Sequence, residues 1–323
     1  MAESTLSLVK QDLSRSVAFY LNYGRKADSS EGLSTNQAAN VDAARQAGER
    51  KFLIEEDWDF LAPELSITLW SAKSGTLTGV YNAGTGISTL TATTAKFFPT
   101  MIGRSIVIAT VGTFTVVGYA SSTVITVTGD ATGAAKSFTM AAGKYRMPDD
   151  FGGPAEDEMR YAPSSGWNQI IIFTTIEMIE RRWQVTVQTQ RPRQAAFLPV
   201  ATPGTTGQRY DMYVEPIPDS DYPVTTRYEI LADALADSIY PYGGLQHAEC
   251  IRFACLAAAE EMFYEGQQSQ RAAFAMALDK SKAINRRKKA QRLGQSNTRY
   301  DQKQYPEWMR CIHGGAYGTT YTG

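Results

Sequence analysis

The stretch from Lys73 to Gly143 has a composition unlike the rest of the chain, and it constrains the fold more than any other feature. It consists mostly of Thr, Gly, Ser, Ala and Val and carries few charges. Runs such as "RSIVIATVGTFTVVGYASSTVITVTGD" are broken by glycine at intervals of about eight to twelve residues, the strand spacing of small all-β domains. Branched side chains favour pleated strands, and glycine permits the turns between them. The pattern predicts a small all-β module, either a sandwich or a barrel.

Larger and more aromatic residues flank this module on both sides. The segment "LAPELSITLW" (61–70) leads into it with the alternation of a strand, and "KYRMPDDFGG" (144–153) leads out of it. If the strands at these two junctions are neighbours in one sheet, the module is an outgrowth of a host domain. We therefore expect a host body of helices and strands formed by residues 1–72 and 144–323, and an inserted domain formed by residues 73–143.

Apolar residues at three- and four-residue spacing predict helices near both ends of the chain. Ser34 and Gln37 form a capping-box pair just before the second helix, and Gly266 separates the last two as a C-cap. The expected helices are Ser4–Tyr23, Gln37–Ile54, Gly244–Tyr264 and Gln267–Leu293.

Between the module and the last two helices, four segments have the composition of strands. The segments "RYDMYVEP" and "YPVTTRYEI" are joined by "IPDSD", which predicts a hairpin. The expected strands are 170–176, 184–190, 209–216 and 222–230. Together with the helices, these segments indicate an α+β protein with mixed strands and an inserted all-β module.

The overall charge does not select a partner. The chain has 32 Lys and Arg against 33 Asp and Glu, a net charge of −1, so no global field favours nucleic acid or an acidic membrane. The N-terminal segment lacks the basic and apolar pattern of a signal peptide, and no run of about eighteen apolar residues occurs. We therefore expect a protein that is made in the cytoplasm and does not span a membrane.

One segment gathers most of the residue types that bind soft metals. His247, Cys250 and Cys255 lie within nine positions, and the other candidates are Cys311 and His313. On a helix His247 and Cys250 share a face, but Cys255 lies about 12 Å further along the axis from His247. We therefore expect a packing helix with free thiols. The alternative is a zinc site that adds Cys311 and His313 to the first two residues, if the end of the chain folds back.

Sequence signatures of catalysis are lacking. The phosphate-binding loop, the dinucleotide-binding turn, the kinase set, GxSxG and HExxH do not occur. Two histidines and no recognisable pair of convergent acids leave little for acid–base catalysis. We therefore expect a protein that is not an enzyme, with no catalytic residue, no cofactor and no metal ligand.

The strongest charge feature is "KSKAINRRKKAQR", Lys280–Arg292, with seven basic residues in thirteen. This run suits contacts with phosphates or with an acidic protein surface, and the alternative is a solvated helix face. The acidic runs 55–59 and 156–158 are expected to be solvated. The alternatives for them are cation binding, or pairing with the basic run of a neighbouring copy.

Four segments carry a resemblance to a known class of proteins. They are "YRMPDDFGG" (145–153), "RPRQAAFLPV" (191–200), "IPDSDYPVTTRYEI" (217–230) and "YPYGGLQHAECIRFACLAAAEEMF" (240–263). In this order, after an N-terminal helical pair, they are similar to the head-to-tail connector or adaptor proteins of tailed bacteriophages, of the tail-tubular-A type. The resemblance covers most of the chain outside the β insert, and the size of that insert is the main departure.

The resemblance implies a helical-bundle body, made by the N- and C-terminal helices, that carries β structure and assembles into a closed, commonly twelve-fold ring. Such a ring lies beneath the portal protein, binds a downstream neck or tail protein, and lets DNA pass without sequence-specific binding. Rings of this kind use heterologous contacts. We therefore expect a structural virion protein. The alternatives are a decoration or receptor-binding (minor tail) protein that uses the β insert, and a nucleic-acid-binding module.

The expected contact residues come from the basic run and from a polar tail, residues 297–323, that orders on a partner. They are Lys280, Lys282, Arg286, Arg287, Lys288, Lys289, Arg292, Tyr300, Tyr305 and Trp308. A second set, at the turn that leads into the helix 244–264, is expected to be structural. It comprises Tyr240, Pro241, Gly243, Gly244, His247 and Glu249.

Overall fold

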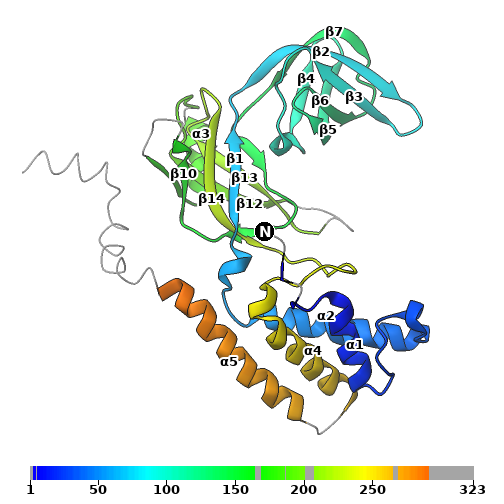
Figure 1. Ribbon diagram of the computed structural model, residues 1–323. Coiled ribbons are helices and arrows are strands. Elements are labelled where there is room, and N and C mark those ends of the chain that lie inside the picture. The colour runs from blue at the N-terminus through cyan, green and yellow to red at the C-terminus, as the bar shows by residue number, and fades with distance from the viewer. Residues whose placement is uncertain are drawn as a thin grey trace, which may run out of the picture. The chain divides into compact units, whose positions relative to one another are not determined.

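The computed structural model shows a mixed α+β protein with a β-barrel module, in agreement with the predicted class (Figure 1). Contacts divide the chain into two compact units, a helical unit of Met1–Ala62 with Ala232–Gly323 and a β unit of Pro63–Leu231. This division differs from the domains expected from the sequence, whose boundaries stay a prediction. The structure describes residues 3, 4, 6–163, 169–185, 187–200, 207–264 and 268–290. Residues 288–290 are described by their backbone only.

Four α-helices are described in the helical unit, each at a segment where the sequence predicts one, although α2 begins two residues before the predicted Gln37. They are α1 (Lys10–Tyr20), α2 (Thr35–Ile54), α4 (Ala248–Phe263) and α5 (Ser269–Ala290). The predicted capping box before α2 is confirmed: Ser34 Oγ accepts from the Gln37 N–H at 3.3 Å, and Gln37 Oε1 accepts from the Ser34 N–H at 3.0 Å. Helix α1 begins later than predicted, because Asp12 Oδ2 accepts from the Val9 N–H at 3.2 Å and caps the helix there.

The core of the helical unit joins segments from both ends of the chain. Buried side chains of α1, α2, α4 and α5 pack together, among them Leu13, Phe52 and Ile251. Helices α2 and α4 approach closely at Gly48, where an added Cβ atom would lie 2.3 Å from Cys255 Cα. Because any larger residue at this position would overlap the backbone of α4, Gly48 sets the distance between the two helices.

The predicted β module is a closed barrel with the strand order β2-β3-β6-β5-β4-β7. Its strands are β2 (Lys73–Asn82), β3 (Ile87–Ala92), β4 (Ser105–Ile108), β5 (Gly112–Ser121), β6 (Val124–Thr128) and β7 (Gly133–Met140). Alternate side chains fill the interior, including Leu77, Leu90 and Phe138. The first and last strands pair at Lys73 and Met140, so the chain enters and leaves the barrel at neighbouring points.

The rest of the β unit is an eight-stranded sheet with the order β1-β14-β10-β11-β12-β13-β8, in which β9 also pairs with β14. The strands are β1 (Glu64–Leu69), β8 (Lys144–Arg146), β9 (Phe151–Pro154), β10 (Glu158–Tyr161), β11 (Ile170–Phe173), β12 (Gln194–Val200), β13 (Arg209–Glu215) and β14 (Tyr222–Ile230). Strands β11 and β12 are parallel and are connected through helix α3 (Ile176–Val185). The buried apolar core extends from this sheet into the barrel.

The predicted strand 184–190 is wrong. Helix α3 extends to Val185, so the first residues of that segment are helical. The reason is visible in Ile176, Ile179 and Trp183, which recur at three- and four-residue spacing and pack against β12 and β13. The β-branched residues of the segment matched a strand, but the apolar spacing just before it is that of a helix.

The predicted hairpin is also wrong, although both of its strands exist. Strand β13 pairs with β12 and β8, whereas β14 pairs with β1, β9 and β10. Strand β13 is buried along most of its length, β14 alternates between buried and half-buried positions, and both strands have partners on each side. Because two central strands of one sheet need not be each other's partners, the short connection between them does not decide the pairing.

The strands at the two junctions, β1 and β8, are not neighbours in the sheet but the two ends of its strand order. Side chains nevertheless bring the junctions together. The Tyr145 hydroxyl donates to the Trp70 carbonyl at 2.8 Å, and the two rings pack edge to face with centroids 5.2 Å apart. The indole N–H of Trp70 donates to Thr100 Oγ1 of the barrel at 3.1 Å. The suggested backbone pairing is therefore replaced by an aromatic contact.

Candidate interaction surface

Helix α5, which carries the basic run, has one buried face and one exposed face. Phe274, Leu278 and Asn285 are buried at helical spacing against the rest of the helical unit. Asn285 ties the helix to the segment after α2, because its Nδ2 donates to the Asp57 carbonyl at 3.0 Å and its Oδ1 accepts from the Asp59 N–H at 3.1 Å. This contact, which the sequence did not reveal, fixes which way α5 turns its basic residues.

The basic residues of α5 lie on and beside its exposed face. Lys280, Arg286 and Arg287 are exposed, and Arg286 retains 70% of its side-chain surface. The open surface around Arg286 and Arg287 also includes Lys282, Ala283 and Asp279. Three basic side chains with one acid give this part of α5 a positive surface that points away from the core.

The acidic run 55–59 lies against α5 of the same chain. Glu55 Oε2 is 3.7 Å from Lys282 Nζ, and Glu56 Oε2 is 3.8 Å from Arg286 Nη2. At these distances near the surface, each ion pair contributes about 0–1 kcal/mol. Pairing of the acidic run with another copy stays a prediction, and within one chain part of its charge already faces the basic helix.

Several expected contact residues lie outside the described side chains. Lys288 and Lys289 belong to α5, but only their backbone is described. Arg292, Tyr300, Tyr305 and Trp308 lie beyond the described residues, as does the expected docking tail 297–323. The structure therefore bears on the first half of the predicted surface, from Lys280 to Arg287.

Glu260 of α4 holds the N-terminus of α5, a role that the sequence did not reveal. Its carboxylate accepts hydrogen bonds from the Gln270 N–H at 3.0 Å, the Arg271 N–H at 3.1 Å and the Ser269 hydroxyl at 3.0 Å, and the Tyr20 hydroxyl adds one at 3.2 Å. Burial alone raises the pKa of Glu260, but these hydrogen bonds outweigh it and hold the pKa below its usual value. Burial, and then the nearby Glu260, raises the pKa of Tyr20 to about 12. A carboxylate at the first turn satisfies free N–H groups and faces the positive end of the helix.

His247 occupies a packing position at the start of α4. Its side chain is 2% exposed, and its ring lies 5.2 Å from the Trp58 ring, 5.2 Å from the Phe60 ring and 6.0 Å from the Phe52 ring, measured between centroids. The backbone carbonyl of His247 accepts from the Ile251 N–H at 3.0 Å, as the first bond of the helix. The arrangement places the imidazole among aromatic rings, where it contributes to the core.

The turn that leads into α4 depends on two glycines. Gly243 and Gly244 have φ values of +97° and +59°, in the left-handed region that glycine adopts without strain. An added Cβ on Gly244 would lie 2.6 Å from Glu3 Oε2, and Glu3 Oε1 accepts from the Leu245 N–H at 3.1 Å. Of the other residues expected to be structural, Pro241 is buried, Tyr240 is half-buried, and Glu249 is exposed and pairs with Arg252 at 2.9 Å.

The two cysteines of α4 point to different neighbours. Cys255 Sγ lies 3.5 Å from the Arg45 carbonyl of α2, whereas Cys250 hydrogen-bonds with Ser281 of α5. Burial raises the pKa of the Cys250 thiol to about 11 and raises that of Cys255 as well, so both stay protonated at neutral pH. Cys311 and His313, which complete the alternative zinc site, lie outside the described residues. Within the described residues, no group of three His, Cys, Asp or Glu side chains is placed to hold a metal ion.

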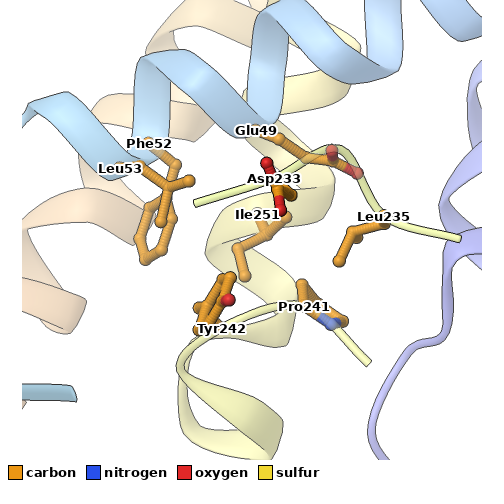
Figure 2. Close-up of a pocket in the computed structure, with 8 residues that line it drawn as sticks. All are labelled: Glu49, Phe52, Leu53, Asp233, Leu235, Pro241, Tyr242 and Ile251. Carbon is orange, nitrogen blue, oxygen red and sulfur yellow. The ribbon is translucent and has the colours of Figure 1, made fainter. Parts of the chain in front are cut away.

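A small cavity lies beside α2 and α4 in the helical unit (Figure 2). Figure 2 shows the carboxylates of Glu49 and Asp233 on one side of it and Pro241 and Tyr242 on the other. Burial raises the pKa of Glu49, although its ion pair with Arg45 at 2.6 Å opposes this. The cavity volume of about 20 Å³ holds about one water molecule.

Comparisons with known proteins do not assign the chain to a family. No protein-family model matches it, and neither does any curated protein sequence. Among the described helices, none is both long and apolar enough to cross a membrane. The fold and the surface of α5 are therefore the basis for the function proposed next.

Proposed function

We propose that this chain is a structural virion protein, a head-to-tail adaptor whose ring joins the portal to the tail of a bacteriophage and surrounds the DNA channel. The observation that carries the proposal is the exposed basic face of α5, at Lys280, Arg286 and Arg287, on a helix whose other face is fixed in the core. A rigid helix with outward positive charge suits contact with an acidic protein surface. The order of segments that resembles adaptor proteins supports the same conclusion.

The packing of the helical unit supports the proposed bundle body. Its core combines α1 and α2 from the N-terminal end with α4 and α5 from the C-terminal end. The close approach at Gly48 and the hydrogen bond from Tyr20 of α1 to Glu260 of α4 make the two ends interdependent. We propose that these four helices are the bundle that a closed ring, twelve-fold by resemblance, repeats from copy to copy.

Two features of the candidate residues favour a structural role over catalysis. The residues with reactive side chains in the described α4 region, His247, Cys250 and Cys255, are buried in packing contacts, and the thiols are protonated. The cavity beside Glu49 holds about one water molecule. The proposed role needs no cofactor, and it requires only self-association and binding to the portal and to a downstream neck or tail protein.

The test is charge reversal on α5. The double variant Arg286→Glu and Arg287→Glu is expected to lose binding to the portal protein, measured by co-sedimentation of purified chains, and to lower the infectivity of particles. The matched control is Arg181→Glu with Arg182→Glu, a neighbouring pair of exposed arginines on α3. If the α5 variant binds the portal and yields infectious particles as well as the control does, the proposed role of the basic helix is wrong.

A second candidate, a decoration or receptor-binding protein, is favoured by the barrel. The barrel closes on itself, its outer strand positions are mainly Thr, Ser, Val and Ala, and its two connections lie side by side at Lys73 and Met140. Such a module can be carried by a host without altering its core. Replacing residues 74–139 by a short glycine linker separates the two functions. Loss of adsorption to cells with retained portal binding supports the second candidate, and the reverse result supports the adaptor.

A further inference from the structure

A surface groove lies on the helical unit between α1, the turn after it, and α4. Its volume is about 530 Å³. Phe19, which is 59% exposed, Tyr20 and Leu256 give it apolar walls. The side chains that give it positive charge are Arg15, Arg25 and Arg252. A large exposed aromatic ring in a concave site is unusual for a surface that faces only water.

The arginines are held in place around this groove. The Arg25 guanidinium lies 5.3 Å from the centre of the Phe19 ring. Arg15 pairs with Glu31 and, at 3.6 Å, with Asp12. Arg252 pairs with Glu249 at 2.9 Å, as described above. Each guanidinium has five N–H donors, so these contacts orient the groups and leave donors for another acceptor. The groove thus combines apolar walls with arginines that are held in place at its rim. This combination suits an aliphatic side chain flanked by carboxylates.

The same unit presents a segment with that chemistry at the end of α2. Ile54 is 76% exposed, among the most exposed of the large apolar side chains in the described residues. Glu55 and Glu56 follow it directly and retain 38% and 20% of their side-chain surface. Their contacts with α5 are long, so little binding energy is lost if they turn to another partner. We name Ile54–Glu56 the α2 knob.

We propose that the α2 knob of one copy docks into the Phe19 groove of the next copy. Knob and groove are built from different residues of one chain, so the contact is heterologous and repeats from copy to copy, as a ring requires. This inference deepens the proposed function, because it rests on ring assembly and names the surfaces that mediate it. Duplex DNA is a poorer occupant of the groove, since its phosphate backbone has no aliphatic side chain to cover Phe19, Tyr20 and Leu256.

Two single substitutions remove one side of the contact each. Phe19→Asp destroys the groove and Ile54→Asp destroys the knob, and both positions are exposed, so folding is expected to be preserved. Sedimentation velocity over a concentration series of the full chain measures self-association. Each variant is expected to associate at least tenfold more weakly, because burial of one large apolar side chain is lost and a charge is introduced. Met276→Asp, at a 68% exposed residue of α5, is the matched control and is expected to associate like the parent chain.

Mixing the two variants tests the heterologous geometry directly. A Phe19→Asp chain keeps its knob and an Ile54→Asp chain keeps its groove, so a one-to-one mixture is expected to form heterodimers that grow no further. The formation of those heterodimers also shows that both variants are folded. The inference is overturned if the parent chain is monomeric at every concentration, if the variants assemble like the parent, or if the mixture stays monomeric while both chains keep the circular dichroism of the parent.

Two controls separate this contact from other functions. If Arg25→Glu abolishes binding of a duplex DNA fragment and leaves self-association unchanged, the occupant of the groove is nucleic acid and the inference is wrong. Binding to the portal protein is measured in a separate assay, with the double variant Arg286→Glu and Arg287→Glu as the chain that is expected to lose it. If the knob does not bind the groove but the chain still binds the portal, only this inference is wrong. If the chains assemble through the knob and the groove but do not bind the portal, the adaptor function is wrong and the contact between copies stands.

Discussion

The barrel and the helical unit reach a buried core by different means. The barrel uses consecutive residues, 73–140, in which every second side chain turns inward, so each strand is encoded locally. The helical unit joins segments about two hundred residues apart in sequence, and it depends on single non-local contacts such as Gly48 against Cys255 and Tyr20 with Glu260. In the barrel, the contacts that stabilise the fold are therefore spread over many alternating side chains. In the helical unit, close packing makes a few single positions critical for stability.

The largest loss of stability is expected from a substitution of Asp211, which tests whether the β unit also depends on a single residue. Asp211 of β13 is buried between Arg104 of the barrel and Arg146 of β8, its cross-strand partner, whose Nε lies 3.0 Å away. Asp211→Asn is expected to lower the free energy of unfolding by about 3–5 kcal/mol, because two buried guanidinium groups lose their counter-charge. Urea denaturation measures this change.

The matched control for Asp211 is Asp149→Asn. Asp149 pairs with Arg209 at 2.8 Å, but its side chain is 79% exposed, so the expected loss is below about 1 kcal/mol. Equal effects of the two substitutions would mean that the buried triad does not join the barrel to the sheet. The β unit would then rest on alternation alone, and the contrast with the helical unit would be sharper.

The next largest effect concerns the contact between α2 and α4. Gly48→Ala is expected to destabilise the helical unit by about 1–3 kcal/mol, because the new methyl group overlaps the backbone at Cys255. The sign is diagnostic, since alanine otherwise stabilises a helix interior by about 1 kcal/mol relative to glycine. Gly153→Ala in β9 is the control, because an added Cβ there meets no atom within 4 Å. The measurement is denaturation monitored by the circular dichroism of the helices. If Gly48→Ala stabilises the chain, the close approach of α2 and α4 is contradicted.

A smaller effect is expected at the cap of α5. Glu260→Gln is expected to cost about 0.5–2 kcal/mol at neutral pH, because a charged acceptor for three groups at the start of the helix is replaced by a neutral one. The pKa of Glu260 is lowered in the folded state, so its stabilisation is fully present above the unfolded pKa of about 4.3 and is lost as the pH falls through the folded pKa.

The pH dependence provides the measurement for this cap. The difference in unfolding free energy between the parent and Glu260→Gln is expected to shrink as denaturation is repeated at acidic pH. Glu261→Gln, next to it on an exposed face and paired with Lys51 at 2.7 Å, is expected to change little at any pH. A difference for Glu260→Gln that stays constant from neutral to strongly acidic pH would show that its carboxylate does not cap α5.

The smallest stability effect is expected on the exposed face of α5. Arg286→Gln removes one long ion pair with Glu56 and is expected to change the unfolding free energy by less than about 1 kcal/mol, with a still smaller change at high salt. The same substitution is expected to weaken portal binding in a pull-down assay. If stability falls by several kcal/mol instead, α5 is held by its charges, and its basic face is structural.

The outcome of the sequence predictions follows the same contrast between local and non-local structure. The all-β module, the four terminal helices and the capping box of Ser34 and Gln37 were predictable, because each is encoded by a pattern within a few consecutive residues, whereas the choice between a sandwich and a barrel stayed open. The strand at 184–190 was wrong because its β-branched residues were given more weight than the helical spacing that precedes them. The hairpin of β13 and β14 was wrong because strand pairing is decided by the whole sheet.

The candidate surface shows a similar limit. The basic character of α5 is evident from its residues, but which of them are exposed depends on Asn285, whose two hydrogen bonds reach the segment after α2. The acidic run 55–59 proved to lie beside this helix in the same chain, a contact between residues more than two hundred positions apart. Spacing within one helix carries no information on such a partner.

The sequence by itself determined the α+β fold class, the position of the β module and the residues that carry charge, because composition and periodicity act over a few neighbouring positions. Only the tertiary structure decided that the barrel closes, that the two junctions meet at Trp70 and Tyr145, and that Gly48 and the hydrogen bond from Tyr20 to Glu260 join the two ends of the chain. These contacts link residues far apart in sequence, and their free energy depends on distances that no local pattern specifies.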